Sequence, residues 1–160
     1  MDVLWGAWIR QINLDQHQQL VDIIGIYHII HKENKSDFPL ITDLHVILAF
    51  EATLAECTKT FKITLEIIDL DATHRIFELN GEIVVPEGDM PLIWYEDYVL
   101  ENVIIREPAY YELSVSIDNQ FKQRVPLWVT APKMWIMNGD ITTEMWGEDY
   151  EYWKQEYEKE

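Results

Sequence analysis

Apolar and polar residues alternate with a period of two along much of this chain. Three segments show the pattern most clearly, with apolar residues at Leu44, Val46, Leu48 and Phe50, at Phe61, Ile63, Leu65 and Ile67, and at Tyr111, Leu113, Val115 and Ile117. Successive side chains of a β-strand point to opposite faces of the sheet, so each segment is predicted to bury one face and expose the other. A register shift of one residue would invert every side chain, so the pattern also specifies strand pairing.

Other segments are apolar at nearly every position and predict further strands. The run from Val21 to Ile30 is rich in β-branched residues and is interpreted as a central strand covered on both faces, although a buried helix has a similar pattern. The remaining strand candidates are Val3 to Ile9, Arg75 to Leu79, Gly81 to Val85, Tyr98 to Ile105 and Arg124 to Val129. Together these segments predict about eight or nine strands.

Turn residues separate the predicted strands. Asp118-Asn119 lies between two strand candidates at the spacing of a tight hairpin, and both residue types tolerate a left-handed backbone. Asn80-Gly81 is either a second hairpin turn or, as the short flanks favour, a bulge within one long strand. Pro126 falls inside a strand pattern and predicts a sheet edge. The sequence therefore predicts an all-β fold, specifically an antiparallel β-sandwich.

The composition changes after residue 130, so two parts are predicted: a β-sandwich domain over 1–130 and an acidic aromatic tail over 131–160. From Asp140 to Glu160 there are eight acidic residues against two lysines. Trp146, Tyr150, Trp153 and Tyr157 recur at helical spacing, which predicts a short C-terminal α-helix with these aromatics on one face. These four residues and Trp135 are the predicted partner-binding residues, because Trp and Tyr dominate binding hot spots. The alternative is a terminal helix that packs Trp146 and Trp153 on its own sandwich.

The charge of the chain limits its partners. The 160 residues carry 29 acidic and 12 basic side chains, which gives a net charge of −17. Such a field repels phosphate backbones and anionic lipids, so neither nucleic acid nor membrane is an expected direct partner. No basic segment precedes an apolar run at the start of the chain, and no apolar stretch reaches the ~20 residues of a membrane span. A cytoplasmic location is therefore predicted.

None of the reactive side chains forms a recognisable catalytic or metal-binding pattern. Cys57 lies between two strand candidates, where Glu56 opposes and Lys59 favours an activated thiol, and it is interpreted as an inert cysteine. The five histidines, at positions 17, 28, 31, 45 and 74, are scattered, so no metal site and no cofactor are predicted. His28 and His31 could share a metal on a helix but point to opposite faces of a strand.

A turn rich in Asp is the remaining candidate for metal binding. Asp69 and Asp71, with Glu66 nearby, could offer oxygen ligands to Ca²⁺. Their spacing lacks the glycine-bearing pattern of a calcium loop. A hairpin turn stabilised by Asp side chains is the preferred interpretation.

The order of several short motifs resembles a family of small bacterial all-β proteins of unknown function. These motifs are Ile24-Gly25-Ile26, Phe38-Pro39-Leu40, the Leu44 to Phe50 strand, the Lys62 to Asp69 strand, and Glu107-Pro108-Ala109-Tyr110-Tyr111 leading into Leu113 to Asp118. The resemblance covers about Val3 to Val129 and implies a single sandwich. It implies no functional residues.

The absence of a catalytic pattern, the aromatic tail and the charge together favour a non-catalytic protein-interaction module or accessory subunit. Its expected partner is a protein with a basic or groove-like surface, bound through the tail, a sheet edge near Pro126, or both. Two alternatives remain open. One is an acidic inhibitor that occupies a nucleic-acid-binding surface, and the other is a carbohydrate-active or metal-dependent enzyme.

Overall fold

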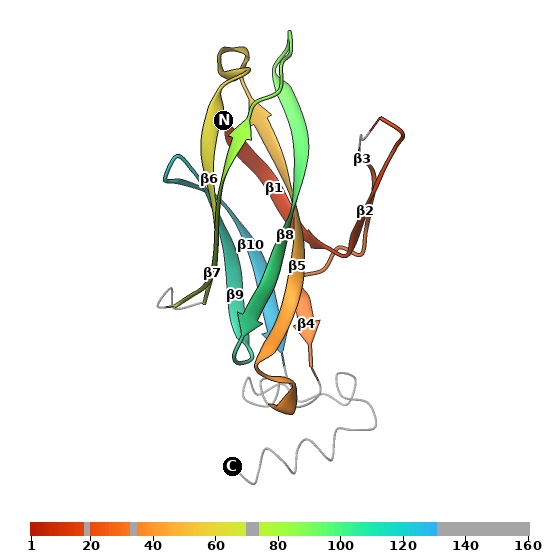
Figure 1. The fold of residues 1–160 in the computed structure, drawn as a ribbon, viewed down its shortest axis with the longest axis vertical. Helices are drawn as coiled ribbons and strands as arrows, with labels where there is room; N and C mark the ends of the chain where they lie inside the picture. Colours follow the sequence, from red (N-terminus) through yellow and green to blue (C-terminus); the bar gives the residue numbers. More distant parts are fainter. Residues whose placement is uncertain (18–19, 33–34, 70–73, 131–160) are drawn as a thin grey trace.

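The computed structural model describes residues 1–17, 20–32, 35–69 and 74–130 (Figure 1). These residues form ten strands and two short 3₁₀ helices, and they contain no α-helix. The elements are β1 (Asp2–Ile9), β2 (Gln11–Leu14), β3 (Leu20–Ile24), β4 (Ile29–His31), η1 (Lys35–Asp37), β5 (Leu40–Ala52), η2 (Leu54–Glu56), β6 (Thr60–Asp69), β7 (Arg75–Val84), β8 (Leu92–Ile105), β9 (Ala109–Ile117) and β10 (Gln120–Thr130). The all-β prediction is confirmed.

The strands form three sheets. A three-stranded sheet has the order β1-β5-β8, a five-stranded sheet has the order β4-β10-β9-β6-β7, and β2 pairs with β3 as a separate arm that stands beside the body in Figure 1. The predicted antiparallel pairing holds for every pair except β4 and β10, which run parallel. A parallel pair requires a crossover connection. More than half of the chain lies between β4 and β10. Local periodicity does not encode a pairing between strands so far apart in the sequence.

One hydrophobic core joins the three-stranded and five-stranded sheets. The alternating residues of β5, β6 and β9 named above supply much of it, and all of them except the half-buried Phe61 are almost fully buried. Each buried aliphatic side chain of this size contributes about 1.5–3 kcal/mol relative to an exposed one. The predicted inward faces of these three strands are therefore correct.

The two sheets meet closely where β1 passes β10. A Cβ atom on Gly6 would lie 2.7 Å from Val125 Cγ2 and 2.6 Å from Leu48 Cδ2, so this approach requires glycine. Two residues later the fully buried Trp8 donates its indole N–H to the Pro126 carbonyl at 3.0 Å. Gly6 and Trp8 therefore connect β1 of the three-stranded sheet to β10 of the five-stranded sheet.

Pro126 lies at a sheet edge, as predicted. It faces Glu112 of β9, whereas β4 pairs with β10 only over residues 128–130. The Trp128 N–H donates to the His28 carbonyl at 2.7 Å, and N–H directions repeat every second residue along a strand. The missing N–H of Pro126 therefore faces the side of β10 where no strand of the described chain pairs, and no ladder hydrogen bond is lost.

The prediction of one central strand from Val21 to Ile30 is wrong. The run divides into β3, which pairs with β2, and β4, which pairs with β10, and Gly25 turns the chain between them with φ +72°. Ile24 is 42% exposed and Ile26 is 65% exposed, so the segment is peripheral. A β-branched composition favours extended backbone but does not state which face is covered.

The hairpin predictions have mixed outcomes. Asp118 and Asn119 have φ values of 47° and 64° and join β9 to β10, as a tight hairpin turn requires. Asn80 and Gly81 lie within the single strand β7, as favoured, but the register with β6 passes through them unbroken, so the predicted bulge is absent there. The predicted C-terminal helix and the domain boundary after residue 130 concern residues outside the described part.

Candidate functional site

The five aromatic residues predicted to bind a partner, Trp135, Trp146, Tyr150, Trp153 and Tyr157, all lie outside the described residues. Their role stays a prediction. The other sequence candidates can be placed. None of the described His, Cys, Asp and Glu side chains gathers in a group of three or more that could hold a metal ion.

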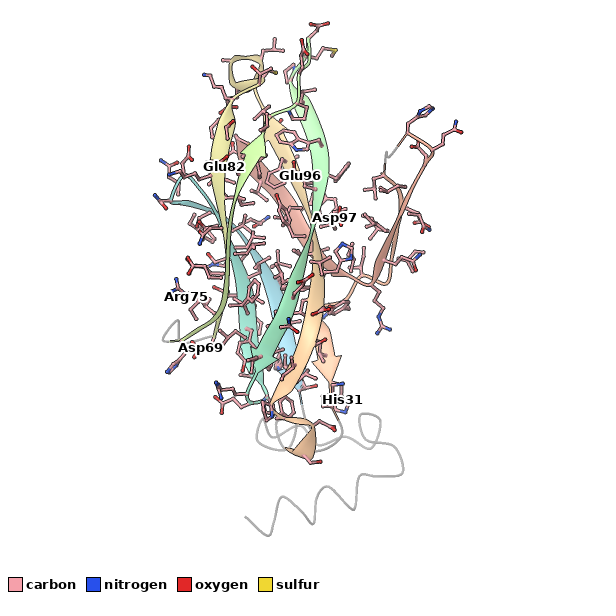
Figure 2. The ribbon with its side chains drawn as sticks, viewed as in Figure 1. His31, Asp69, Arg75, Glu82, Glu96 and Asp97 are labelled. Atoms are coloured by element: carbon pink, nitrogen blue, oxygen red, sulfur yellow. The ribbon has the colours of Figure 1, made fainter. Side chains whose placement is uncertain are left out.

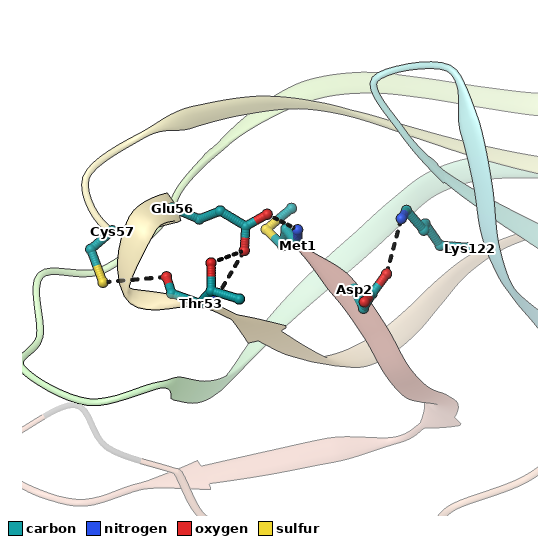
Figure 3. A network of polar contacts seen from close by, with 6 residues as sticks. All are labelled: Met1, Asp2, Thr53, Glu56, Cys57 and Lys122. Carbon is teal, nitrogen blue, oxygen red and sulfur yellow. Dashed lines mark hydrogen bonds and ion pairs between the residues drawn. The ribbon is translucent and has the colours of Figure 1, made fainter.

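Cys57 lies in a polar network at the start of the β5–β6 connection (Figure 3). Its Sγ lies 3.8 Å from the carbonyl oxygens of Thr53 and Gly88, which accept a hydrogen bond from the thiol. The neighbouring Glu56 carboxylate accepts from the Met1 α-amino group and from the Thr53 backbone N–H. These two hydrogen bonds, of which the one from Met1 has the larger effect, lower the pKa of Glu56 to about 2. The contacts of this network support the structural interpretation of Cys57.

The histidine and aspartate candidates form pairs. His74 Nδ1 lies 3.2 Å from Asp69 Oδ2, and the His74 backbone N–H donates to Asp69 Oδ1 at 3.3 Å. Asp69 therefore stabilises the ends of the β6–β7 hairpin, in agreement with the preferred interpretation, while Asp71 lies outside the described residues. His45 Nε2 lies 2.8 Å from Asp97 Oδ2.

Apolar side chains cover much of the outer side of the three-stranded sheet. Those of β1 and β8 are exposed, and Ile47 and Ala49 between them are buried. We define the outer face as Trp5 of β1, Ile47 and Ala49 of β5, and Ile93, Tyr95 and Val99 of β8. Ile93 is 58% exposed, Val99 50% and Tyr95 46%. These residues alternate with side chains such as Trp94 and Tyr98 that pack against the core. Since β8 carries large apolar groups on both sides, one side must meet solvent or a partner.

Two aromatic rings form the centre of the outer face. Trp5 and Tyr95 have ring centroids 5.7 Å apart at an interplanar angle of 51°, and the β5 residue between them in the register is Ala49. Ala49 is fully buried, and its methyl group is small enough for rings from the two flanking strands to meet over it. The rings are therefore held by neighbours on a rigid sheet.

The β2–β3 arm extends this surface. Ile12, Leu14 and Leu20 of the arm line a cavity of about 120 Å³ together with Ile47 and Tyr95. Leu14 remains 45% exposed. The arm thus forms a wall at one side of the outer face, and the surface is concave between arm and sheet.

The outer side of the five-stranded sheet is more polar at its centre. Its strands present charged and hydroxyl side chains that pair with one another: Thr64 Oγ1 donates to Asn80 Oδ1 at 2.9 Å, and Arg75 lies 3.0 Å from Glu78. Glu82 and Arg75 project from this side in Figure 2. A solvated sheet face is normally polar in this way, although this side also exposes Val84 at 59% and Phe121 at 54% near its ends.

The edge of the three-stranded sheet lies at β8, a strand of 14 residues. No other strand of the described chain pairs with its free side. Glu96 points inward from this edge, where its carboxylate accepts from Tyr98 OH at 2.7 Å and from Trp94 Nε1 at 3.3 Å (Figure 2). Burial, and then the hydrogen bond to Glu96, raise the pKa of Tyr98. An inward charge on an edge strand opposes indiscriminate strand addition.

The fold and this surface describe an all-β protein with an exposed apolar face beside a long sheet edge. The chain belongs to the DUF6941 family, a family of unknown function, whose family model matches residues 11–130. The predicted resemblance to an uncharacterised family is confirmed. The comparison with curated proteins gives no match. None of the helical segments in the described part has the length and apolar character that a membrane crossing requires.

Sequence reasoning missed the outer face because the predicted strand began at Tyr98. The first part of β8, residues 92–97, contains Ile93 and Tyr95 but also the charged pair Glu96 and Asp97. The charges interrupt the apolar run, and no strand was predicted before Tyr98. The signal was present in the alternation of Ile93, Tyr95, Asp97 and Val99 at every second position.

Proposed function

We propose that this protein is a non-catalytic interaction module or accessory subunit, in which a rigid β-sandwich presents the outer face and the β8 edge to a protein partner. The observation that carries the proposal is the group of exposed apolar side chains around the Trp5–Tyr95 ring contact, next to the β8 edge that is unpaired within the described chain. Solvated strands without a partner have no need of such side chains.

The residue types on the outer face suit an interface. Trp and Tyr are enriched among hot-spot residues, and they bury a large area while losing few rotamers. Trp5 and Tyr95 already contact each other, so little conformational entropy remains to be lost on binding. The outer face therefore provides pre-organised aromatic anchors.

The negative charge of the chain favours a partner with a basic surface. The chain carries a net charge of −17, and β8 adds Glu96, Asp97 and Glu101 next to the apolar residues. A partner segment that combines apolar side chains with lysine or arginine would match both features, and the opposite charges would accelerate association. A basic residue placed opposite Glu96 would also remove the obstacle that this inward charge presents to strand addition. We assign the partner as an extended, basic and apolar segment that lies along β8.

The C-terminal tail offers a second contact in this proposal. Its aromatic residues Trp146, Tyr150, Trp153 and Tyr157 and its acidic residues have the same combination of anchors and negative charge as the outer face. A partner with two basic sites could engage both, and linked contacts raise the apparent affinity. The inhibitor and enzyme hypotheses stay predictions.

Ile93→Lys is expected to weaken partner binding at least about tenfold, because a charge replaces an apolar contact and repels a basic partner. A photo-crosslinking residue at position 14 first identifies the partner through its crosslinked peptide. Capture of that partner from native lysate by immobilised full-length protein then measures binding. Val84→Lys is the matched control, since Val84 is 59% exposed and lies on β7 in the other sheet. Equal capture of the crosslinked partner by Ile93→Lys and Val84→Lys would exclude the outer face.

A further inference from the structure

A second cleft lies on a different part of the molecule, between the end of β1, the strand β4 and the first half of β5. It encloses about 470 Å³, within the range of small-molecule sites. Its lining combines the cationic residues Arg10 and Lys32 with His31, His45, Asp43 and several apolar residues. No residue of the outer face belongs to this lining.

The cleft concentrates positive charge in a strongly acidic protein. Arg10 and Lys32 face it, and neither side chain forms an ion pair with any described residue. His31 and His45 add two further groups that can carry positive charge. In a chain of net charge −17, cations are expected to be neutralised by neighbouring acids, as Arg75, Lys122 and Arg124 are. Lys59, Lys62 and Arg106 also form no ion pair with a described residue, so the distinguishing feature of the cleft is that two such cations line the same cavity.

The acidic residue in the lining is already engaged. Asp43 Oδ1 accepts the Asn102 backbone N–H at 2.8 Å, where Asn102 takes a left-handed conformation with φ 54°. Asp97, which lies outside the lining, pairs with His45. The Asp43 carboxylate therefore has a structural partner on β8, and the structure pairs it with neither Arg10 nor Lys32.

The cationic side chains are positioned by the fold. Gly25 has φ +72°, and a Cβ atom there would lie 2.8 Å from Arg10 Cδ, so the stem of Arg10 rests directly on the glycine backbone. On the other side of the cleft, His31 Nδ1 lies 2.9 Å from Thr130 Oγ1, and the Lys32 backbone N–H donates to the Thr130 carbonyl at 3.0 Å. Thr130 is buried, so it holds the His31 ring and the Lys32 backbone from inside the protein.

Apolar and aromatic groups complete the walls. Ile29 and Ile30 supply aliphatic surface, and the half-buried Tyr27 supplies a phenol. Burial raises the pKa of Tyr27, and the positive charge of Arg10 acts in the opposite direction, so the phenol lies within the field of the guanidinium. A cleft with apolar walls and with cations that are unpaired among the described residues fits a ligand that has both kinds of surface.

We propose that this cleft binds a small organic anion, whose phosphate or carboxylate group contacts Arg10 and Lys32 and whose apolar body lies against Ile29 and Ile30. Guanidinium and ammonium groups both form charge-assisted hydrogen bonds to these oxyanions, and arginine does so with two parallel bonds. The outer face and the cleft share no residue, although His45 of the lining pairs with Asp97 of β8, so the two proposed activities have separate tests.

The test is an NMR titration of the full-length protein with phenyl phosphate, inorganic phosphate and benzoate. Phenyl phosphate is expected to shift the backbone amides of residues 10, 29–32 and 42–45 saturably, and to bind more tightly than inorganic phosphate because its ring covers the apolar wall. Tighter binding of benzoate than of phenyl phosphate would assign the head group as carboxylate, and the reverse order would assign phosphate. Equal affinity for phenyl phosphate and inorganic phosphate would overturn the organic part of the proposal.

Two charge-neutral variants locate the binding site. Arg10→Gln and Lys32→Gln should each weaken phenyl phosphate about tenfold or more, since a hydrogen bond between charged groups is lost. Lys62→Gln is the matched control, because Lys62 is an exposed lysine on the outer side of β6 without an ion pair among the described residues, and should change affinity less than twofold. Gly25→Ala, which displaces the Arg10 stem, should weaken binding with both charges intact. Absence of saturable shifts in the cleft, or an equal loss in Lys62→Gln, would overturn the proposal.

Discussion

Trp8→Ala is expected to lower the free energy of unfolding by about 3–5 kcal/mol, the usual cost of truncating a buried tryptophan. Trp8 is fully buried, and its indole N–H donates to the Pro126 carbonyl at the point where the two large sheets meet. Truncation therefore removes core volume and also leaves an edge carbonyl of β10 without its donor. Urea denaturation of the full-length protein with linear extrapolation measures the change.

Two further variants separate the components of this effect. Trp8→Phe keeps most of the ring volume but loses the donor, so a cost of about 1–3 kcal/mol is expected. Trp5→Ala is the matched control on the same strand, because Trp5 is 37% exposed and lies on the outer face. It should cost about 1 kcal/mol, mainly from the lost contact with Tyr95, while it weakens partner binding. A Trp8→Ala protein as stable as Trp5→Ala would show that β1 and β10 are not coupled through Trp8.

Much of the fold could be predicted from residue periodicity. The segments around Val46, Leu65 and Val115 bury one face and expose the other, and this is the condition under which a period of two is informative. Strands such as β5 and β10 were predicted too short. The alternation of apolar and polar residues is lost at strand ends where both faces are exposed or both are covered. The Asp118-Asn119 turn was recognisable because its left-handed backbone selects few residue types.

What could not be predicted depends on contacts between distant segments. Val21 to Ile30 has a composition suited to a central strand, but Gly25 places its halves in two different sheets. The parallel pairing of β4 with β10 and the contact between Trp8 and Pro126 join residues that are about 100 or more positions apart. No local sequence pattern specifies these pairings, because alternative folds of the same strands differ only in which strand surfaces meet.

The candidate sites illustrate the same limit. Trp5 and Tyr95 meet only because β1 and β8 flank the same strand, with Ala49 between them. Arg10 and Lys32 share a cleft only because Gly25 turns the chain back and β4 joins the sheet edge. The charges and aromatics are evident in the sequence, whereas their grouping into an apolar face and a cationic cleft is a property of the topology.

Stability is expected to fall steeply above about pH 10, where buried tyrosines begin to favour the unfolded state. Burial, and then the charges of Glu107 and Asp69, raise the pKa of Tyr111 to about 12, and burial also raises that of Tyr98. An unfolded tyrosine loses its proton near pH 10, so above this pH the unfolded state binds fewer protons than the folded state. The stabilisation from Tyr111 is complete below pH 10 and is lost as the pH rises to about 12, by about 2–3 kcal/mol.

Tyr111→Phe should reduce this loss, because phenylalanine has no proton to release. At neutral pH the variant should be about 1 kcal/mol less stable, since the Tyr111 hydroxyl donates to the Glu107 carbonyl at 2.8 Å. Ile63→Val is the control: it costs about 0.5–1.5 kcal/mol at a buried position and keeps both tyrosines, so its pH curve should run parallel to that of the wild type. Urea midpoints measured from pH 8 to pH 12 distinguish the two variants. If Tyr111→Phe and Ile63→Val lose stability with the same slope, the alkaline transition has another origin, because ionisation of Tyr111 would then make no contribution to it.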